Sequence, residues 1–316
     1  MAKCPICGAE ATLYAKGLYE LDGVGYDLVR CSGCKVVCVD PFPDEKRVAA
    51  LYDDKYFEKD YSFGIVDGDY LASEVARESE YRRILSRIAR LTPGRNMLEV
   101  GCAAGAFLKE ASSQGWNVTG VDVSPWAVKT AREKFALDVR EGTLVDQEFP
   151  AAKFDAVFFG DLLEHLPDPV AFLREAARVV KPHSEGGVVV AKVPTYVNSF
   201  YYRWLKKGTN VLSFGGYSGD MMQLLKLSDT AKRMPPYHLF EYNPSSVGYV
   251  FNKAGLVVFE EEKTLMIPEF LHTQKSLGGM FLSMLFGAMK FMIESFNLPG
   301  GHVLVFATPS NEGGFI

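Results

Sequence analysis

Short apolar runs alternate with helical patterns along most of the chain. Apolar residues at 97–100 and 118–121 predict two strands, and the residues between them predict a helix that ends at Gly115. The near-continuous apolar run 154–160 is typical of a strand that helices cover on both faces. Further strands are predicted at 138–140, 186–193, 256–261 and 302–309, and further helices at 73–91, 124–135, 171–180, 245–254 and 277–296. This alternation predicts an α/β fold.

A turn of small residues, Gly101–Gly105, joins the first of these strands to its helix. Without bulky side chains, such a turn lets a ligand lie against the backbone at the helix N-terminus. The second strand ends on Asp122, where a carboxylate can accept hydrogen bonds from both hydroxyls of a ribose. The adenosine of a cofactor would satisfy both features.

Glu99 separates the two cofactors that compete for this geometry. An NAD-type fingerprint reads G-x-G-x-x-G, whereas these glycines read G-x-x-x-G and follow a carboxylate. A negative charge there would repel a pyrophosphate but can pair with the ammonium of an amino-acid-bearing cofactor. The pattern E-x-G-C-x-x-G followed by V-x-G-V-D resembles the cofactor motifs of class I S-adenosylmethionine (SAM) dependent methyltransferases.

The resemblance spans about residues 73–309 and implies a Rossmann-like seven-stranded class I methyltransferase sheet, closed by an antiparallel pair at 256–261 and 302–309. It also implies that the cofactor is SAM. The cofactor-binding residues would be Glu99, Gly101, Cys102, Ala103, Gly105, Asp122, Val123, Ser124, Gly142, Thr143, Leu144 and Asp161.

Two histidines are candidates for the general base of such a reaction. His165 lies in an E-H-L-P-D-P segment that looks like the one in many small-molecule methyltransferases, and His238 stands where the same family often has a histidine at the acceptor pocket. An imidazole suits this role because its ordinary pKa lies near neutrality. Alternatively, His165 caps or packs the next helix and His238 is a buried, hydrogen-bonded core residue.

Two insertions are predicted within the methyltransferase domain. The aromatic-rich segment 196–236 is assigned to acceptor recognition, with packing or a dimer surface as the alternative. The second insertion, 265–300, contains the apolar 277–296 helix, which would pack on the domain, on a second subunit in a homodimer, or against a lipid-linked acceptor. Tyr52 and Tyr56 either cover the cofactor pocket or pack as part of a connector. Arg203, Lys206 and Lys207 either meet a phosphate or form a solvated helix face.

Two C-x-x-C pairs near the N-terminus predict a zinc ribbon with Cys4, Cys7, Cys31 and Cys34 as ligands. Four thiolates suit a closed, structural zinc site, and a segment this short lacks a core that could fold alone. A redox C-x-x-C is the rival interpretation. The predicted organisation is a zinc ribbon at 1–40, a connector at 41–72 and a methyltransferase domain at 73–316.

The composition and charge of the chain bear on which kinds of partner it could bind. The 316 residues carry a formal charge of −5, with 48% hydrophobic and 23% charged residues, so no general attraction to nucleic acid is expected. No secretory signal and no transmembrane segment are predicted, which favours a cytoplasmic protein. The predicted function is methyl transfer to a small-molecule hydroxyl, such as that of a sugar or glycan precursor. The alternatives are an RNA methyltransferase and a non-catalytic module that binds SAM or a partner.

Overall fold

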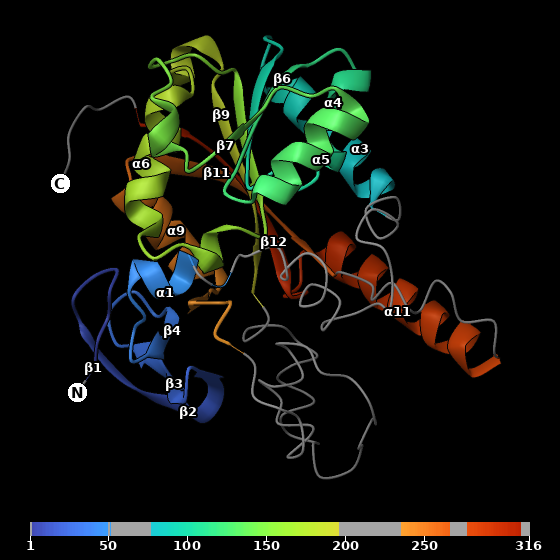
Figure 1. Cartoon of the computed structure of the whole chain (residues 1–316). Coiled ribbons are helices and arrows are strands. Elements are labelled where there is room, and N and C mark those ends of the chain that lie inside the picture. Colours follow the sequence, from blue (N-terminus) through green and yellow to red (C-terminus); the bar gives the residue numbers. More distant parts are fainter. Residues whose placement is uncertain (1, 50, 52–76, 196–234, 266–276, 311–316) are drawn as a thin grey trace.

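The fold is known from a computed structural model, which describes residues 2–49, 51, 77–195, 235–265 and 277–310. The predicted roles of Tyr52, Tyr56, Arg203, Lys206 and Lys207 lie outside these residues, as do most of the connector and of the 196–236 insertion. The described chain forms a seven-stranded sheet flanked by helices and a smaller five-stranded sheet near the N-terminus (Figure 1).

The large sheet has the strand order β11-β12-β9-β8-β5-β6-β7. Its central strands β5, β6, β7, β8 and β9 are parallel, and β12 and β11 close it as an antiparallel pair. The strands are β5 (Asn96–Val100), β6 (Asn117–Asp122), β7 (Val139–Glu141), β8 (Ala156–Gly160), β9 (Val188–Pro194), β11 (Leu256–Thr264) and β12 (His302–Pro309). After β5 the chain adds β6 and β7 on one side of the sheet, and then β8 and β9 on the other side of β5. Open α/β sheets bind ligands at such a switch in strand order, here between β5 and β8.

Helices cover both faces of this sheet (Figure 1). They are α3 (Glu78–Leu91), α4 (Ala106–Ser113), α5 (Pro125–Phe135), α6 (Pro169–Val179) and α9 (Pro244–Lys253). In β8 the side chains of Ala156 and Phe158 join the cluster under α3 and α4, whereas those of Val157 and Phe159 join the cluster under α6 and α9. Successive side chains of a strand point to opposite faces of the sheet, and both faces of β8 are buried. The apolar run 154–160 follows from this, because residues on either face contact the core.

The predicted element order is confirmed, and the boundaries differ by a few residues. The 277–296 helix is present as α11 (Leu277–Phe296), which extends away from the sheet (Figure 1). It exposes large apolar side chains at Met284, Phe291 and Phe296. No helix among the described residues is both long and apolar enough to cross a membrane.

The small sheet contains the N-terminal cysteines and has the order β1-β2-β3-β4-β10. Its strands are β1 (Ala2–Lys3), β2 (Glu10–Leu21), β3 (Val24–Cys31), β4 (Val37–Asp40) and β10 (Phe240–Glu241), and α1 (Glu45–Ala49) follows β4. We call residues 2–40 the cysteine module. The sequence did not indicate β10, which comes from the methyltransferase part of the chain and pairs with β4 of the module.

Candidate active site

The turn after β5 has the backbone shape that its small residues indicate. Gly101, Ala103 and Gly105 have positive φ angles of 70°, 45° and 84°. At Gly105 an added Cβ would lie 2.7 Å from Leu137, so this glycine is also required by the packing of α4 on its neighbours. At Gly101 the nearest side chain would be that of Leu162, which reaches over the turn from the segment after β8.

Asp122 fixes this turn. Its Oδ2 accepts a hydrogen bond of 2.8 Å from the Ala103 N–H, and its Oδ1 accepts one of 2.9 Å from the Ser124 N–H. Burial raises the pKa of Asp122, while these backbone donors oppose that rise. Each carboxylate oxygen has two lone pairs, so both oxygens can still accept from ribose hydroxyls. Glu99, two residues before Gly101, is a second buried acid on the neighbouring strand.

The other predicted cofactor residues of this region divide into exposed and buried ones. Val123 is exposed, and Thr143 donates two hydrogen bonds to Asp146. By contrast, Cys102 and Leu144 are core residues, so their side chains pack inside the protein. Ser124 caps α5 by accepting from the Ala127 N–H, and Gly142 donates its N–H to the Asp122 carbonyl.

Asp161, which is partly exposed, belongs to a charge network with buried partners that sequence reasoning missed. Its Oδ2 lies 3.5 Å from Nζ of Lys192, and its Oδ1 lies 3.5 Å from Nε2 of His302. Lys192 also pairs with Glu80 of α3 at 3.2 Å. Burial alone would raise the pKa of Asp161, but the opposing effect of Lys192 and His302 is larger and holds that pKa well below its usual range. A lysine at the carboxyl end of a buried strand was the signal that could have indicated this network.

The structure brings His165 and His238 together, with ring centroids 4.9 Å apart. Nε2 of His165 lies 3.6 Å from Oε1 of Glu164, and Nε2 of His238 lies 4.0 Å from the same oxygen. On its other side, Nδ1 of His238 lies 3.4 Å from Oε1 of Glu241. The sequence predicted the two histidines but neither glutamate. Ligand atoms of Glu164, His165 and His238 lie within 4.8 Å of one another, so a cation could also bridge them.

Burial sets the charges in this cluster. It raises the pKa of Glu164 to about 8; the charge that His238 carries when protonated opposes this rise, and the nearby Asp161 charge adds to it. Burial and the neighbouring His238 lower the pKa of His165 to about 3. Nδ1 of His165 lies 2.8 Å from the Tyr237 carbonyl, which can only accept, so this nitrogen carries the proton. Near neutral pH, His165 is therefore a neutral imidazole beside a protonated carboxyl group.

Part of the sequence that builds this site is similar to known proteins. Residues 98–190 match the family described as a methyltransferase domain. The 2-methyl-6-phytyl-1,4-hydroquinone methyltransferase of Synechocystis sp. (strain ATCC 27184 / PCC 6803 / Kazusa) is 30% identical over 184 residues, which are 56% of this chain and 55% of that protein. Residues 98–190 thus match a methyltransferase domain, and the seven-stranded sheet to which they belong has the Rossmann-like class I methyltransferase fold. The predicted Rossmann-like class I fold is thereby confirmed.

One further relative and one solved structure are also similar to this chain. The ubiquinone biosynthesis O-methyltransferase of Xanthomonas campestris pv. campestris (strain B100) is 36% identical over 106 residues, 31% of this chain and 43% of that protein. The structure of magnesium protoporphyrin IX methyltransferase from Synechocystis PCC 6803, with bound SAH, has a TM-score of 0.52 at 12% identity, covering 84% of this chain and 100% of that one. This likeness concerns the fold. The chain spans about half the length of the curated relatives it matches.

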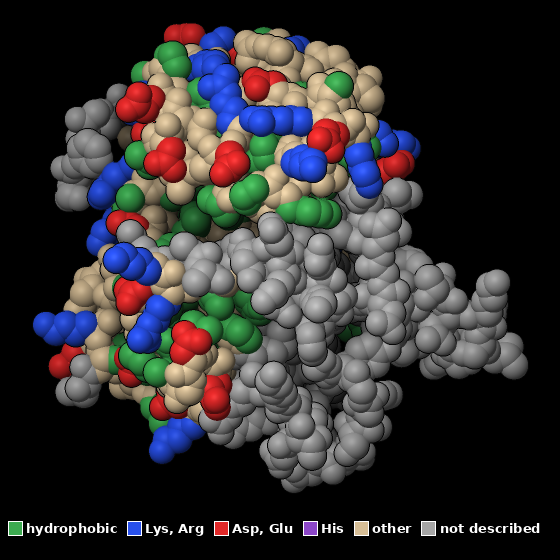
Figure 2. All heavy atoms as spheres, in the orientation of Figure 1, with side chains coloured by type: hydrophobic (Ala, Val, Ile, Leu, Met, Phe, Trp, Pro, Cys, Tyr) green, Lys and Arg blue, Asp and Glu red, His purple; other side chains and the backbone are tan. Residues whose placement is uncertain are grey.

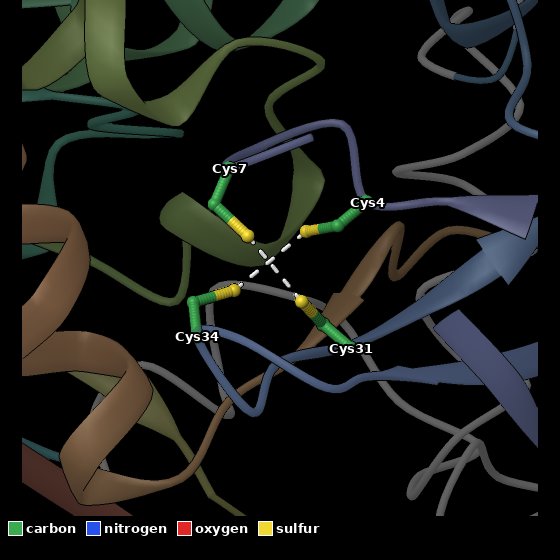
Figure 3. Close-up of side chains that lie close together, drawn as sticks. All are labelled: Cys4, Cys7, Cys31 and Cys34. Atoms are coloured by element: carbon green, nitrogen blue, oxygen red, sulfur yellow. Dashed lines mark hydrogen bonds between the residues drawn. The ribbon is translucent and has the colours of Figure 1, made fainter. Parts of the chain in front are cut away.

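Outside the methyltransferase domain, the four predicted metal ligands lie close together in the cysteine module. Figure 3 shows their sulfur atoms pointing toward a common centre from two turns of the chain. The Sγ atoms of Cys4 and Cys34 are 3.6 Å apart, and those of Cys7 and Cys31 are 3.3 Å apart. A tetrahedral site with zinc–sulfur bonds of about 2.3 Å needs sulfurs about 3.8 Å apart, so the set fits such a metal.

Proposed function

We propose that the chain transfers a methyl group from SAM to a hydroxyl group of a small molecule. The observation that carries this proposal is the pair of buried acids, Glu99 and Asp122, at the ends of adjacent strands beside the turn Gly101–Gly105. The histidine cluster after β8 lies at the same edge of the sheet, because the carboxyl ends of parallel strands share one edge.

The cofactor site would divide between the two acids. Asp122 would accept from the ribose hydroxyls, and Glu99 would pair with the ammonium of the methionine part. When bound, SAM supplies an electrophilic methyl group on a sulfonium. The remaining work of the protein is to align the acceptor oxygen with that group and to exclude water, which can supply most of the acceleration.

His238 is the proposed general base. Since Glu241 can only accept as a carboxylate, Nδ1 of His238 carries the proton beside it, and Nε2 is left with a lone pair that can take the acceptor proton. Proton removal by such a base contributes roughly a further 100- to 10,000-fold. His165 is the weaker candidate, because its low pKa of about 3 gives it little affinity for the proton it would have to accept.

A sugar or glycan precursor remains the first acceptor class expected from the sequence. A quinol is the second, favoured by relatives whose names refer to hydroquinone and ubiquinone chemistry. The exposed apolar side chains of Met284, Phe291 and Phe296, with 67%, 70% and 72% exposure, would suit the lipophilic tail of such an acceptor. Both classes present a hydroxyl to the base, so O-methylation is proposed for either.

We also infer that the cysteine module holds one structural zinc ion through Cys4, Cys7, Cys31 and Cys34. With four protein ligands no position is left for a substrate, which separates this ion from the methyl-transfer chemistry. RNA is the less favoured acceptor. On the face in Figure 2, basic and acidic side chains are interspersed over the described surface, whereas RNA binding favours clustered lysine and arginine side chains.

Methyl transfer from labelled SAM tests this function. The purified chain is incubated with hydroquinones and, separately, with nucleotide sugars and lipid-linked glycans. Labelled product from one class supports the proposal and names the acceptor class. His238→Ala should keep SAM affinity and lose turnover by at least about 100-fold. Tight SAM binding without turnover of any hydroxylated compound would instead favour a non-catalytic binding module, and product from RNA alone would reverse the choice of acceptor.

A further inference from the structure

The segment that carries His238 is hydrogen-bonded on two sides. The Leu239 N–H donates to the Glu164 carbonyl at 2.8 Å, which ties the segment to the turn after β8. The Leu239 carbonyl accepts at 3.1 Å from the Val39 N–H of β4 in the cysteine module. One residue therefore links the methyltransferase domain to the module, directly after His238.

The next residues extend this link into a sheet. Phe240 pairs with Cys38, and Glu241 pairs with Val37, in the antiparallel ladder of β10 and β4. Farther along, the Asn243 side chain donates to the Lys35 carbonyl at 3.0 Å. The Phe240 ring also lies 5.3 Å from that of Phe42, just after the module. Backbone pairing, a side-chain bond and ring packing thus place β10 relative to the module.

Glu241 is the charged residue of this strand, and it is 1% exposed. Its Oε1 lies 3.4 Å from Nδ1 of His238. A buried carboxylate next to an imidazole selects the tautomer with the proton on the nearer nitrogen and fixes the orientation of the ring. The opposite nitrogen, Nε2, is then the basic one.

We propose that Glu241 is a positioning residue for His238, and that the cysteine module holds Glu241 in place through the pairing of β4 with β10. This inference rests on the proposed role of His238 in methyl transfer. It makes the module an integral part of the acceptor side of the site, although none of its cysteines touches the acceptor.

The other charged groups around His238 do not replace Glu241. Glu164 faces Nε2 at 4.0 Å, but burial raises its pKa to about 8, so it is protonated near neutral pH. His165 packs edge-on against the His238 ring and is neutral under the same conditions. Among the described neighbours of the ring, Glu241 is thus the group placed to accept from Nδ1.

The tautomer of His238 tests the positioning role without an acceptor. The full chain, labelled with ¹⁵N in its five histidines, is compared with Glu241→Met, which keeps the side-chain length but removes the acceptor. His238→Gln assigns the His238 signal. We expect loss of the Nδ1–H tautomer preference in Glu241→Met and partial retention in Glu241→Gln, whose amide oxygen still accepts. Exposed Glu133→Met on α5 is the matched control and should change nothing.

Affinity for S-adenosylhomocysteine, measured by calorimetry, should stay within twofold in these variants, because the cofactor site lies over β5 and β6. Unchanged His238 ring signals in Glu241→Met would overturn the positioning role. If Glu241→Met fails to bind S-adenosylhomocysteine, Glu241→Gln decides: a His238 signal identical to that of the parent chain contradicts the proposal.

Hydrogen exchange of the unaltered chain tests the role of the module. We expect the amides of Val39 in β4 and Glu241 in β10, which belong to the pairing of these two strands, to be protected in the zinc-loaded chain and to lose protection together, at least about tenfold, after chelation. The Val157 amide in β8 and the affinity for S-adenosylhomocysteine should not change. A Glu241 amide that stays protected after chelation would contradict the coupling.

None of these measurements requires an acceptor or turnover. The positioning role of Glu241 can therefore be refuted independently of the proposed methyl transfer. An inactive chain with an intact His238–Glu241 pair would refute the methyl transfer but not the positioning. An active chain whose His238 tautomer ignores Glu241 would refute the positioning alone.

Discussion

At the residue scale, Asp122 has a structural role in addition to the ribose-binding role proposed for it. Its carboxylate accepts one hydrogen bond from the Ala103 N–H in the Gly101–Gly105 turn and another from the N–H of Ser124, the residue that caps α5. The carboxylate at the end of a strand was predicted to bind a ribose. Its hydrogen bond from Ala103 shows that the same carboxylate also stabilises the turn on which the rest of the cofactor would lie.

Asp122→Ala should therefore weaken SAM binding by at least about 100-fold, since hydrogen bonds to a charged group are worth about 1.5–3 kcal/mol each. Titration calorimetry measures the affinity. The matched control is Asp138→Ala: Asp138 is an exposed residue just before β7, at the amino ends of the parallel strands and so at the opposite edge of the sheet. Parent-like affinity in Asp122→Ala would refute the ribose assignment.

Glu164 makes stability depend on pH. Burial raises its pKa from the ordinary 4.5 to about 8, so the folded chain keeps a proton that the unfolded chain releases. Its stabilising contribution is complete below about pH 4.5 and is lost as the pH rises to about 8, by up to about 1.4 kcal/mol per pH unit. His165, with its pKa lowered to about 3, has the opposite sign and loses its contribution as the pH falls below about 6.5.

Urea unfolding at pH 5, 6.5 and 8 separates the two effects when the parent chain is compared with Glu164→Gln. The free energy of unfolding of the parent should fall relative to that of the variant as the pH rises, because the variant has no proton to release. A constant difference between the two across this range would show that Glu164 is not protonated in the folded chain.

Some site residues could be predicted and others could not, for a physical reason. Asp122 and Glu99 lie at fixed offsets from a glycine turn, so local sequence places them. The network of Asp161, Lys192 and His302 joins residues from three separate strands and their ends, and only the sheet order brings them together. The roles of all predicted cofactor residues stay predictions.

At the element scale, the long periodic segments were predictable and the shortest strand was not. A run such as 154–160 is apolar throughout, and this composition by itself indicates a strand that is buried on both faces. β10 has two residues, too few for any period, and it exists because β4 offers an unpaired edge. In the same way, the sequence shows that the residues packed under α3 and α4 are apolar, but it does not show which strands they contact.

The β10 strand is nevertheless firmly packed, because Phe240 is fully buried between Phe42 and Tyr242. Phe240→Ala should lower the free energy of unfolding by about 3–5 kcal/mol, as expected for a large-to-small change in a core. Urea unfolding measures this loss. Phe259→Ala on β11, where the ring is half-exposed, should cost much less. Equal losses in the two variants would mean that β10 is not part of the core.

At the scale of the whole molecule, the core runs through both sheets. A single cluster of buried residues contains Cys4, Cys31 and Cys34 together with Leu98 and Phe251 of the methyltransferase domain. The sequence predicted a separate ribbon, because its cysteine spacing is local, but gave no sign of this shared core. The domain boundaries, the cytoplasmic location and the homodimer stay predictions.

The proposed zinc site can be tested with two buried cysteines that differ in position. Cys34→Ser should lose the zinc, which elemental analysis should otherwise find at one per chain, because Cys34 points at the sulfur cluster. Cys38→Ala should keep the metal, since Cys38 lies in β4 outside that cluster. Full zinc content in Cys34→Ser, or loss in Cys38→Ala, would contradict the assigned ligand set.

The central claim is that the ends of β5 and β6 bind a SAM-type nucleoside between Glu99 and Asp122. Calorimetric titration of the full chain with SAM and, separately, with NADH tests it most directly. We predict saturable binding of one SAM per chain and no binding of NADH, whose pyrophosphate Glu99 would repel. Binding of NADH without binding of SAM would contradict the account.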